Sequence, residues 1–204
     1  MRLKNVKGAK EKIEVSKYII NKNEFKNDNP IHIEIGMGKG KFIIEKALNN
    51  KDINFIGIEK FDSVIVRALE KVEDQNIPNL KFMRFDALNI DQVFDKEIDT
   101  IYLNFSDPWP KNRHVDRRLT SPIFLEKYKK ISKNNTHIIM KTDNRKLFEY
   151  SLEMFSLNNF EIKKISLNLH QDDVEDNIMT EYEMKFSQKG DIIYMVEVIQ
   201  RLDI

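Results

Sequence analysis

IHIEIGMGKGKF, the stretch Ile31–Phe42, decides the fold class of this chain. Its alternating apolar residues predict a strand, its three glycines at a spacing of two predict a tight loop, and a helix is expected to follow. Glycines let the backbone approach a ligand closely, and a helix N-terminus offers unpaired N–H donors. After the first strand of a parallel sheet, this pattern favours a nucleoside-cofactor site over a plain turn.

Outward from this stretch, short apolar runs rich in Ile, Val and Phe alternate with segments of helical periodicity. Strands are predicted at about Ile31–Gly36, Asn54–Glu59, Lys81–Asp86, Asp99–Phe105, His137–Thr142, Glu161–Asn168 and Ile192–Gln200. Helices are predicted at about Lys41–Asn49, Asp62–Asn76, Thr120–Ser132 and Asn144–Leu157, with Asp62 and Asn144 as N-caps.

This order of elements predicts an α/β fold with a mostly parallel seven-stranded sheet, right-handed crossovers and helices on both faces. The last two strands have no long helix between them, so we expect them to pair antiparallel at one edge. The 204 residues suit a single domain, residues 27–204, preceded by a mobile basic N-terminal arm or helix, residues 1–26.

Composition excludes several classes of protein. There is no cysteine, which rules out disulfides, zinc–thiolate sites and iron–sulfur clusters, and the four histidines lack metal-ligand spacing. No run of about 18 apolar residues and no signal peptide is recognisable, so we expect a cytoplasmic protein. The net charge of +1 gives no global nucleic-acid signature.

The glycine loop also narrows the choice of cofactor. Dinucleotide sites prefer G-x-G-x-x-G, but the third glycine position is here Lys41. The pattern therefore fits a ligand without phosphates, of which S-adenosylmethionine is the obvious one. Glu59, at the end of the second strand, could accept from a ribose diol, and Asp86, at the end of the third, from an adenine amine. Glu34 could face the methionine ammonium or brace the loop; each acid alone could equally be an ordinary strand-end residue.

A second informative stretch, NFSDPWPKNRH at Asn104–His114, follows the fourth strand. It combines a carboxylate at Asp107 with the only tryptophan, Trp109, two prolines and several cations. In a sheet of order 3-2-1-4-5 the crevice opens between strands 1 and 4, so this loop should face the glycine loop. Asp-Pro alone is a routine turn signal, but Trp109 between two prolines favours a stiff loop that holds a flat ligand.

Charge is distributed unevenly along the chain. Residues 1–26 carry eight cations against three acids, and residues 171–183 hold six acids without Lys or Arg. A third cluster consists of Lys111, Arg113, His114, Arg117 and Arg118, with Asp116 as its only acid. Each run could be a solvated segment, and the basic ones are also candidates for phosphate contacts.

Three blocks of this sequence resemble bacterial tRNA (guanine-N7-)-methyltransferases. They are Asn104–Lys111 with Arg113, His114 and Arg117–Leu119; Lys141–Asn144 with Leu147 and Phe148; and Thr180–Glu183 with Lys185, Phe186 and Gly190. The matches keep the family order from about residue 30 onward. One departure is Asp116, where relatives often have a cation.

The resemblance implies a Rossmann-like class I methyltransferase fold. It also implies methyl transfer from S-adenosylmethionine to N7 of guanine 46 in the variable loop of tRNA, which leaves S-adenosylhomocysteine and uses no metal. The implied cofactor-binding residues are Glu34, Gly36, Gly38, Gly40, Glu59, Asp86, Ala87 and Asp107, with Asp107 catalytic. The implied substrate-binding residues are Lys111, Arg113, Asp143, Thr180, Glu181, Tyr182 and Glu183.

This chemistry is coherent on physical grounds. Guanine N7 carries a lone pair and no proton, so no base need act before it attacks a methyl group. A nearby carboxylate would favour the positive charge that develops on the base. We assign this role to Asp107. Glu181 or Glu183 could meet the Watson–Crick edge of guanine, unless their segment is only a solvated acidic loop.

Two other readings stay open at the level of sequence. Ser106-Asp107-Pro108-Trp109 resembles the Asn/Asp-Pro-Pro-aromatic motif of exocyclic-amine methyltransferases. A non-catalytic tRNA-binding protein would keep the same basic residues.

Trp109 could be a base-stacking platform or a wedge within the loop, and His32 and His137 are expected to be core residues.

Overall fold

The computed structural model describes residues 6–172, 174 and 177–200 and has one mixed sheet at its centre. Its strands are β1 (Ile31–Ile35), β2 (Asn54–Glu59), β3 (Leu80–Arg84), β4 (Ile98–Asn104), β5 (Ser132–Thr142), β6 (Phe160–Ser166) and β7 (Tyr194–Gln200). They are arranged in the order β3-β2-β1-β4-β5-β7-β6. The first five strands pair in parallel, whereas β7 runs antiparallel to both of its neighbours.

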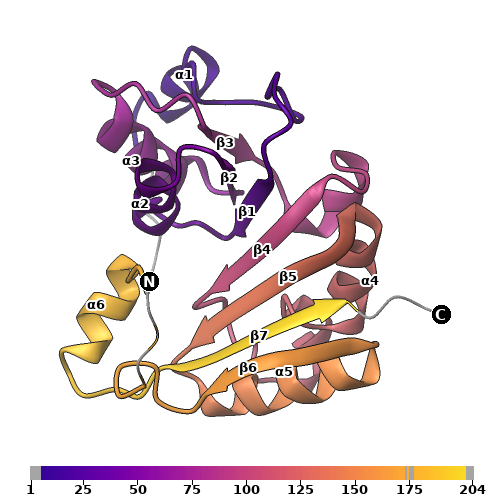
Figure 1. Ribbon diagram of the computed structural model, residues 1–204. Helices are drawn as coiled ribbons and strands as arrows, with labels where there is room; N and C mark the ends of the chain where they lie inside the picture. The colour runs from indigo at the N-terminus through magenta and orange to yellow at the C-terminus, as the bar shows by residue number, and fades with distance from the viewer. Residues whose placement is uncertain (1–5, 173, 175–176, 201–204) are drawn as a thin grey trace.

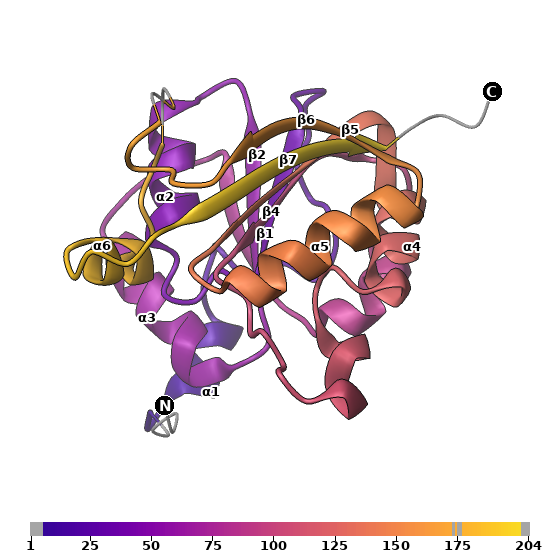
Figure 2. The same ribbon diagram turned by 90° about the horizontal axis from the view of Figure 1, so that it is seen from below.

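Helices cover both faces of this sheet (Figure 1). They are α1 (Ala9–Glu14), α2 (Lys41–Asn49), α3 (Asp62–Val72), α4 (Pro122–Ile131), α5 (Arg145–Leu157) and α6 (Glu181–Ser187), with short 3-10 helices η1 (Ala87–Gln92) and η2 (Asn112–Arg117). Figure 2 shows α2 and α3 on one side of the strands and α4 and α5 on the other. Each layer buries its own apolar cluster against the sheet. No helix in the described part of the chain is long and apolar enough to cross a membrane.

The predicted architecture is confirmed. All seven strands and four long helices occur where periodicity places them, and the last two strands pair antiparallel. The strand that opposes the rest, β7, lies between β5 and β6 rather than at the edge. β5 also begins earlier than predicted, because Ser132 pairs with Ile98 and the Thr136 hydroxyl donates to the Ile98 carbonyl at 2.6 Å.

One of the two predicted N-caps is wrong. Asn144 caps α5 as expected, since its side chain accepts from the Leu147 N–H at 2.9 Å. The cap of α3 is instead Phe61, and Asp62 lies in the first turn, where its carboxylate forms an ion pair with Arg84. An acid in the first turn still favours the helix through the helix dipole.

The N-terminal segment differs from the predicted mobile arm. From Ala9 to Ile20 it packs on the domain: Ile13 is buried in the cluster formed with α2 and α3, and the Tyr18 hydroxyl donates to the Gln75 carbonyl at 2.6 Å. Ile20 donates to the Phe82 carbonyl and so continues the sheet beyond β3. Arg2 and Lys4 of the predicted arm lie outside the described residues.

Helix α6 is an element that the sequence analysis missed, although its signal was present. Thr180 and Glu183 form a capping box, in which the Glu183 N–H donates to Thr180 Oγ1 at 2.9 Å and the Thr180 N–H to Glu183 Oε2 at 3.4 Å. Ser or Thr followed three residues later by Glu is a recognisable helix start. The sequence analysis predicted no helix here and left the segment as either substrate-binding or a solvated acidic loop.

Two glycines of the β1–α2 loop supply a test of how this loop packs against α3. Gly40 and Gly38 both have positive φ, at 76° and 56°. A Cβ on Gly40 would lie 2.9 Å from Ala68 Cβ in α3, whereas one on Gly38 would meet nothing within 4 Å. We expect Gly40→Ala to lower the free energy of unfolding by about 1–3 kcal/mol more than Gly38→Ala, because only Gly40 adds overpacking to backbone strain. Urea denaturation of both variants measures this difference; equal losses would contradict it.

Candidate functional site

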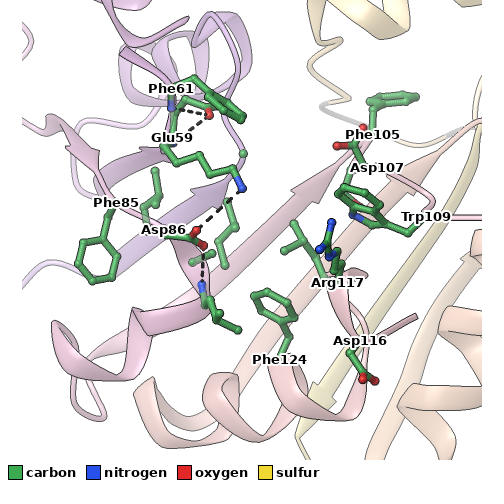
Figure 3. Close-up of a pocket in the computed structure, with 18 residues that line it drawn as sticks. Glu59, Phe61, Phe85, Asp86, Phe105, Asp107, Trp109, Asp116, Arg117 and Phe124 are labelled. Atoms are coloured by element: carbon green, nitrogen blue, oxygen red, sulfur yellow. Dashed lines mark hydrogen bonds and ion pairs between the residues drawn. The ribbon is translucent and has the colours of Figure 1, made fainter. Parts of the chain in front are cut away.

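A cavity of about 570 Å³ opens at the carboxyl ends of the parallel strands. Figure 3 shows Glu59 and Asp86 on one side of it and Asp107 and Trp109 on the other. The residues that line it are Ile35, Gly36, Ile58, Glu59, Lys60, Phe61, Phe85, Asp86, Ala87, Leu88, Phe105, Ser106, Asp107, Trp109, Asp116, Arg117, Leu119 and Phe124. The crevice predicted between strands 1 and 4 is therefore present, with the glycine loop and the Asp107 loop on one cavity.

Gly36 and Gly40, two of the three glycines of the loop, have different surroundings. Gly36 lines the cavity, and a Cβ there would meet nothing within 4 Å, so the backbone is open to a ligand. The Gly36 N–H donates to the Ile58 carbonyl at 2.8 Å, which ties the loop to β2. Gly40 is buried against α3 instead, where a Cβ would lie too close to Ala68, and its contact with a cofactor stays a prediction.

Glu59 and Asp86 face the cavity as predicted, and local backbone groups fix both carboxylates. Glu59 Oε1 accepts from the N–H groups of Lys60 and Phe61 at 2.8 and 3.1 Å, and burial raises the pKa of this carboxyl. Asp86 caps η1 by accepting from the Leu88 N–H at 3.0 Å, and Lys60 Nζ lies 3.9 Å from its Oδ2. Ala87 follows at the same edge.

Glu34 is not among the residues that line the cavity. Only 1% of it is exposed, and Asn104 Nδ2 on β4 donates to its Oε1 at 2.9 Å. Glu34 Oε2 and Asn104 Oδ1 are buried without a partner among the described residues. Burial raises the pKa of Glu34 to about 8, against the effects of Asn104 and Lys141. In this structure Glu34 joins the end of β1 to β4 through Asn104, and its two expected roles, facing the methionine ammonium or bracing the loop, stay predictions.

The Asp107 loop has an unusual backbone. Phe105 and Trp109 both have positive φ, at 51° and 40°, although neither is glycine. Asp107, between them, is exposed, and no hydrogen bond or ion pair engages its carboxylate within the described part of the chain. The Trp109 ring lies between His114, at 5.8 Å, and the Arg117 guanidinium, at 5.0 Å. It therefore packs within the loop while also lining the cavity.

The basic residues after this loop divide into two groups. Lys111 and Arg113 are exposed, and Arg117 is exposed beside the cavity. Arg118 is half-buried, and its guanidinium donates to the Pro108 and Trp109 carbonyls at 3.0 and 3.2 Å. The sequence pattern could not separate Arg117 from Arg118, since adjacent residues differ only in the direction of their side chains.

Helix α6 adds an aromatic group at the rim. Tyr182 stacks on Phe186, with 4.0 Å between ring centroids, and lies 5.0 Å from the Phe105 ring. Its hydroxyl donates to Asp143 Oδ2 at 2.9 Å, and burial together with this bond raises the pKa of Tyr182 to about 12. Two predicted substrate-binding residues, Asp143 and Tyr182, are thus brought together next to the Asp107 loop.

Glu183 is placed differently from its expected role at a guanine edge. It is fully buried and forms an ion pair with Lys141 Nζ at 2.6 Å, while its other oxygen accepts from Asn177 Nδ2 at 2.9 Å. Its carboxylate holds α6 to β5 and does not reach the surface. Glu181 is exposed, and its carboxylate pairs with Lys71 on α3. The acidic segment therefore serves partly as an internal anchor.

Lys141 is the partner that sequence reasoning left without a role. Its side chain is 5% exposed, it donates to the Ile178 carbonyl at 3.0 Å, and burial lowers its pKa. A lysine within an apolar strand was the available signal. The prediction that His32 and His137 are core residues is wrong, since both are only half-buried. His32 bonds to Tyr102 and Thr100 between β1 and β4, and His137 bonds to Glu197.

Comparison with known proteins gives consistent results. A family model described as "putative methyltransferase" matches residues 28–196. A tRNA (guanine-N(7)-)-methyltransferase of Streptococcus mutans is 51% identical and covers 97% of this chain and 99% of its own length. One of Lachnoclostridium phytofermentans is 48% identical, over 95% and 96%. Among solved structures, an antibiotic-related methyltransferase superimposes with a TM-score of 0.64 at 17% identity over 85% and 88% of the chains, which shows the shared fold.

The buried Glu34 predicts a pH dependence of stability. Its pKa rises from 4.5 in the unfolded chain to about 8 in the folded protein, so the folded state binds an extra proton between these values. Stability associated with this group is therefore present below about pH 4.5 and lost as the pH rises toward 8, by at most ~1.4 kcal/mol per pH unit. Glu34→Gln removes this loss. Its unfolding free energy, relative to the parent, should rise between pH 5 and pH 8 in urea titrations; parallel pH profiles would refute the burial argument.

The Lys141–Glu183 pair predicts a second stability effect. Lys141→Met removes the lysine from a buried carboxylate that keeps Asn177 and, at 3.3 Å, His170 Nε2 as neighbours, and should cost up to about 3–5 kcal/mol of unfolding free energy. The double variant Lys141→Met/Glu183→Leu should lose less than the sum of the single changes, because no unpaired charge remains. Arg145→Met, which breaks an exposed pair with Glu149, is the control and should change stability little. Additive losses in the double variant would argue against a coupled pair.

Proposed function

The chain belongs to the tRNA (guanine-N(7)-)-methyltransferase family, and we propose from this premise which residues bind the two substrates and carry the reaction. It transfers a methyl group from S-adenosylmethionine to N7 of a guanine in tRNA. We place the target at guanine 46 of the variable loop, giving 7-methylguanosine, and the reaction in the cytoplasm. The observation that carries the assignment of residues is a single cavity shared by the glycine loop, two strand-end acids and Asp107.

The residues of this cavity fit S-adenosylmethionine. The open space beside Gly36 gives an extended ligand access to the backbone, and Glu59 offers a fixed acceptor for a ribose diol. Apolar side chains such as Ile58, Phe61 and Leu88 suit an adenine ring, with Asp86 as acceptor for its amine. The cofactor supplies a methyl group on a sulfonium cation, whose carbon bonds to N7 as the carbon–sulfur bond breaks and its electrons return to sulfur.

The protein needs no general base for this reaction. Guanine N7 has an available lone pair and carries no proton, and the product releases none. What the chain must provide is alignment of the two reacting atoms, which can lower the barrier by ~7–11 kcal/mol at best. The positive charge passes to the guanine ring. An anion near the base therefore stabilises the transition state more than the ground state.

Asp107 is the residue that we assign to this role. Its carboxylate is exposed on the cavity, and no cation of the described chain neutralises it. In this position it can accept from the guanine N1–H or amino group, which orients N7, and favour the charge that develops on the ring. Tyr182 and Asp143 at the rim supply an aromatic face and a further acceptor for the RNA.

The remaining RNA contacts are assigned to exposed cations. Lys111, Arg113 and Arg117 are exposed in the segment that follows Asp107, with Arg117 on the cavity, and are suited to the phosphates on either side of the target base. The N-terminal lysines are weaker candidates than the sequence suggested, because Lys12 pairs with Glu70 and Lys17 donates to the Gln75 carbonyl. The tRNA is thus expected to approach over η2 and α6.

A labelled-methyl assay on unmodified tRNA tests the function. Label should enter tRNA that has guanosine at position 46 and should not enter the same tRNA with 7-deazaguanosine there. The analogue keeps the Watson–Crick edge and lacks only the N7 lone pair. Digestion of the product should yield 7-methylguanosine. Label in 7-deazaguanosine tRNA, or in an exocyclic amine, would overturn the proposal, and binding without any transfer would indicate a non-catalytic tRNA-binding protein.

Asp107→Ala tests the catalytic assignment. We expect a loss of kcat of about 10²–10³-fold, the effect typical of removing one group that stabilises developing charge. The dissociation constant of S-adenosylmethionine, measured by calorimetry, should change much less. Asp116→Ala removes another exposed carboxylate from the same cavity and should alter kcat only slightly. Turnover of Asp107→Ala near the parent value would show that the role belongs to another residue.

A further inference from the structure

The Asp107 loop holds a backbone conformation that needs external support. Positive φ at the two non-glycine residues Phe105 and Trp109 costs of order 1–3 kcal/mol each. Such strain persists only where surrounding groups fix the segment. Pro108 and Pro110 restrict their own φ but cannot determine where the loop points relative to the domain.

Arg118 provides a contact of the required kind. Its Nε donates to the Pro108 carbonyl at 3.0 Å and its Nη2 to the Trp109 carbonyl at 3.2 Å. One planar group thus holds two successive carbonyls directly after Asp107, a geometry that the rigid guanidinium fork suits and a lysine does not. The same guanidinium lies 4.3 Å from the centroid of the Tyr150 ring on α5. The loop is thereby linked to a helix of the core.

The neighbouring arginine is a natural comparison. Arg117 lines the cavity, is exposed, and lies over the Trp109 ring at 5.0 Å. Arg118 is half-buried, with donors engaged by backbone carbonyls and its flat face against Tyr150. Two adjacent and chemically identical residues are therefore directed to different partners, one toward the cavity and its ligand, the other toward the protein.

We propose that Arg118 is a positioning residue that fixes the direction of Asp107 through the Pro108 and Trp109 carbonyls, with Tyr150 as its platform, and is not a phosphate contact. This inference rests on the proposed role of Asp107. It goes beyond that role by separating one arginine from the basic cluster and by including a residue of α5 in the support of the reaction.

The fluorescence of Trp109 allows the proposal to be tested without measuring turnover. It is the only tryptophan of the chain, so its fluorescence reports on the loop alone. Arg118→Lys keeps the charge and loses the fork. We expect kcat to fall at least tenfold, since misplacement of a catalytic group by about 1 Å can cost 10²-fold. Acrylamide quenching of Trp109 should increase in the free protein, while tRNA affinity at fixed salt stays within twofold of the parent.

Five companion variants sharpen the test. Tyr150→Leu removes the platform and should reproduce both the loss of kcat and the increased quenching, whereas Tyr150→Phe keeps the ring and should restore both. Arg117→Gln removes a charge beside the cavity and should reduce the slope of log Kd for tRNA against log salt by about 1, whereas Arg118→Gln should not. Arg145→Lys, an exposed change on α5, controls for the substitution itself and should alter neither signal.

The proposal is overturned if Arg118→Lys retains parent kcat and parent quenching, or if Arg118→Gln lowers the salt slope while the Trp109 signal is unchanged. Should Arg118→Lys fail to fold by circular dichroism, the pair Tyr150→Leu and Tyr150→Phe decides: equal kcat and quenching in both would refute the role of the platform. Failure of the proposed function is a separate result, because the parent protein would then transfer no methyl group to tRNA even though the quenching comparison remains valid.

Discussion

The two central strands, β1 and β4, are hydrogen-bonded neighbours whose chains leave toward opposite faces of the sheet. After β1 the chain passes into α2, and after β4 it passes through η2 into α4 on the other side. Parallel pairing continues up to Glu34, where the Asn104 side chain still joins the two strands, and beyond it the loops must separate. The cavity exists because of this divergence, and every candidate site residue depends on it for its neighbours.

Local pattern and topology together were enough to predict the order of the five parallel strands, the cavity and the residues Glu59, Asp86 and Asp107 that face it. These positions could be predicted because the carboxyl ends of parallel strands all lie at the same edge of the sheet. What could not be predicted depends on tertiary partners. Glu34 and Glu183 look like cofactor or substrate acids in the sequence, yet each is buried against a residue 70 or 42 positions away. The direction of Arg118 is likewise set by Tyr150, on another helix.

Charge in this protein is used more for internal contacts than the composition suggests. The N-terminal lysines that looked like an RNA-binding arm are partly engaged by α3 and by backbone carbonyls, and Lys141 is buried beneath α6. A chain of net charge +1 can therefore present a concentrated cationic surface after Asp107 without being basic as a whole. Where the charges lie, and not their sum, decides the contact with an anionic partner.

The contact between Phe105 and Tyr182 has a thermodynamic consequence. Phe105 belongs to the wall of the cavity, whereas Tyr182 belongs to a helix at its rim, and their rings are 5.0 Å apart. A small molecule that displaced the Phe105 ring would also change the packing of Tyr182, and binding within the cavity would then be coupled to binding at the rim by a free energy. Linkage makes this coupling reciprocal: whatever factor the inner ligand applies to the affinity of the outer one, the outer ligand returns.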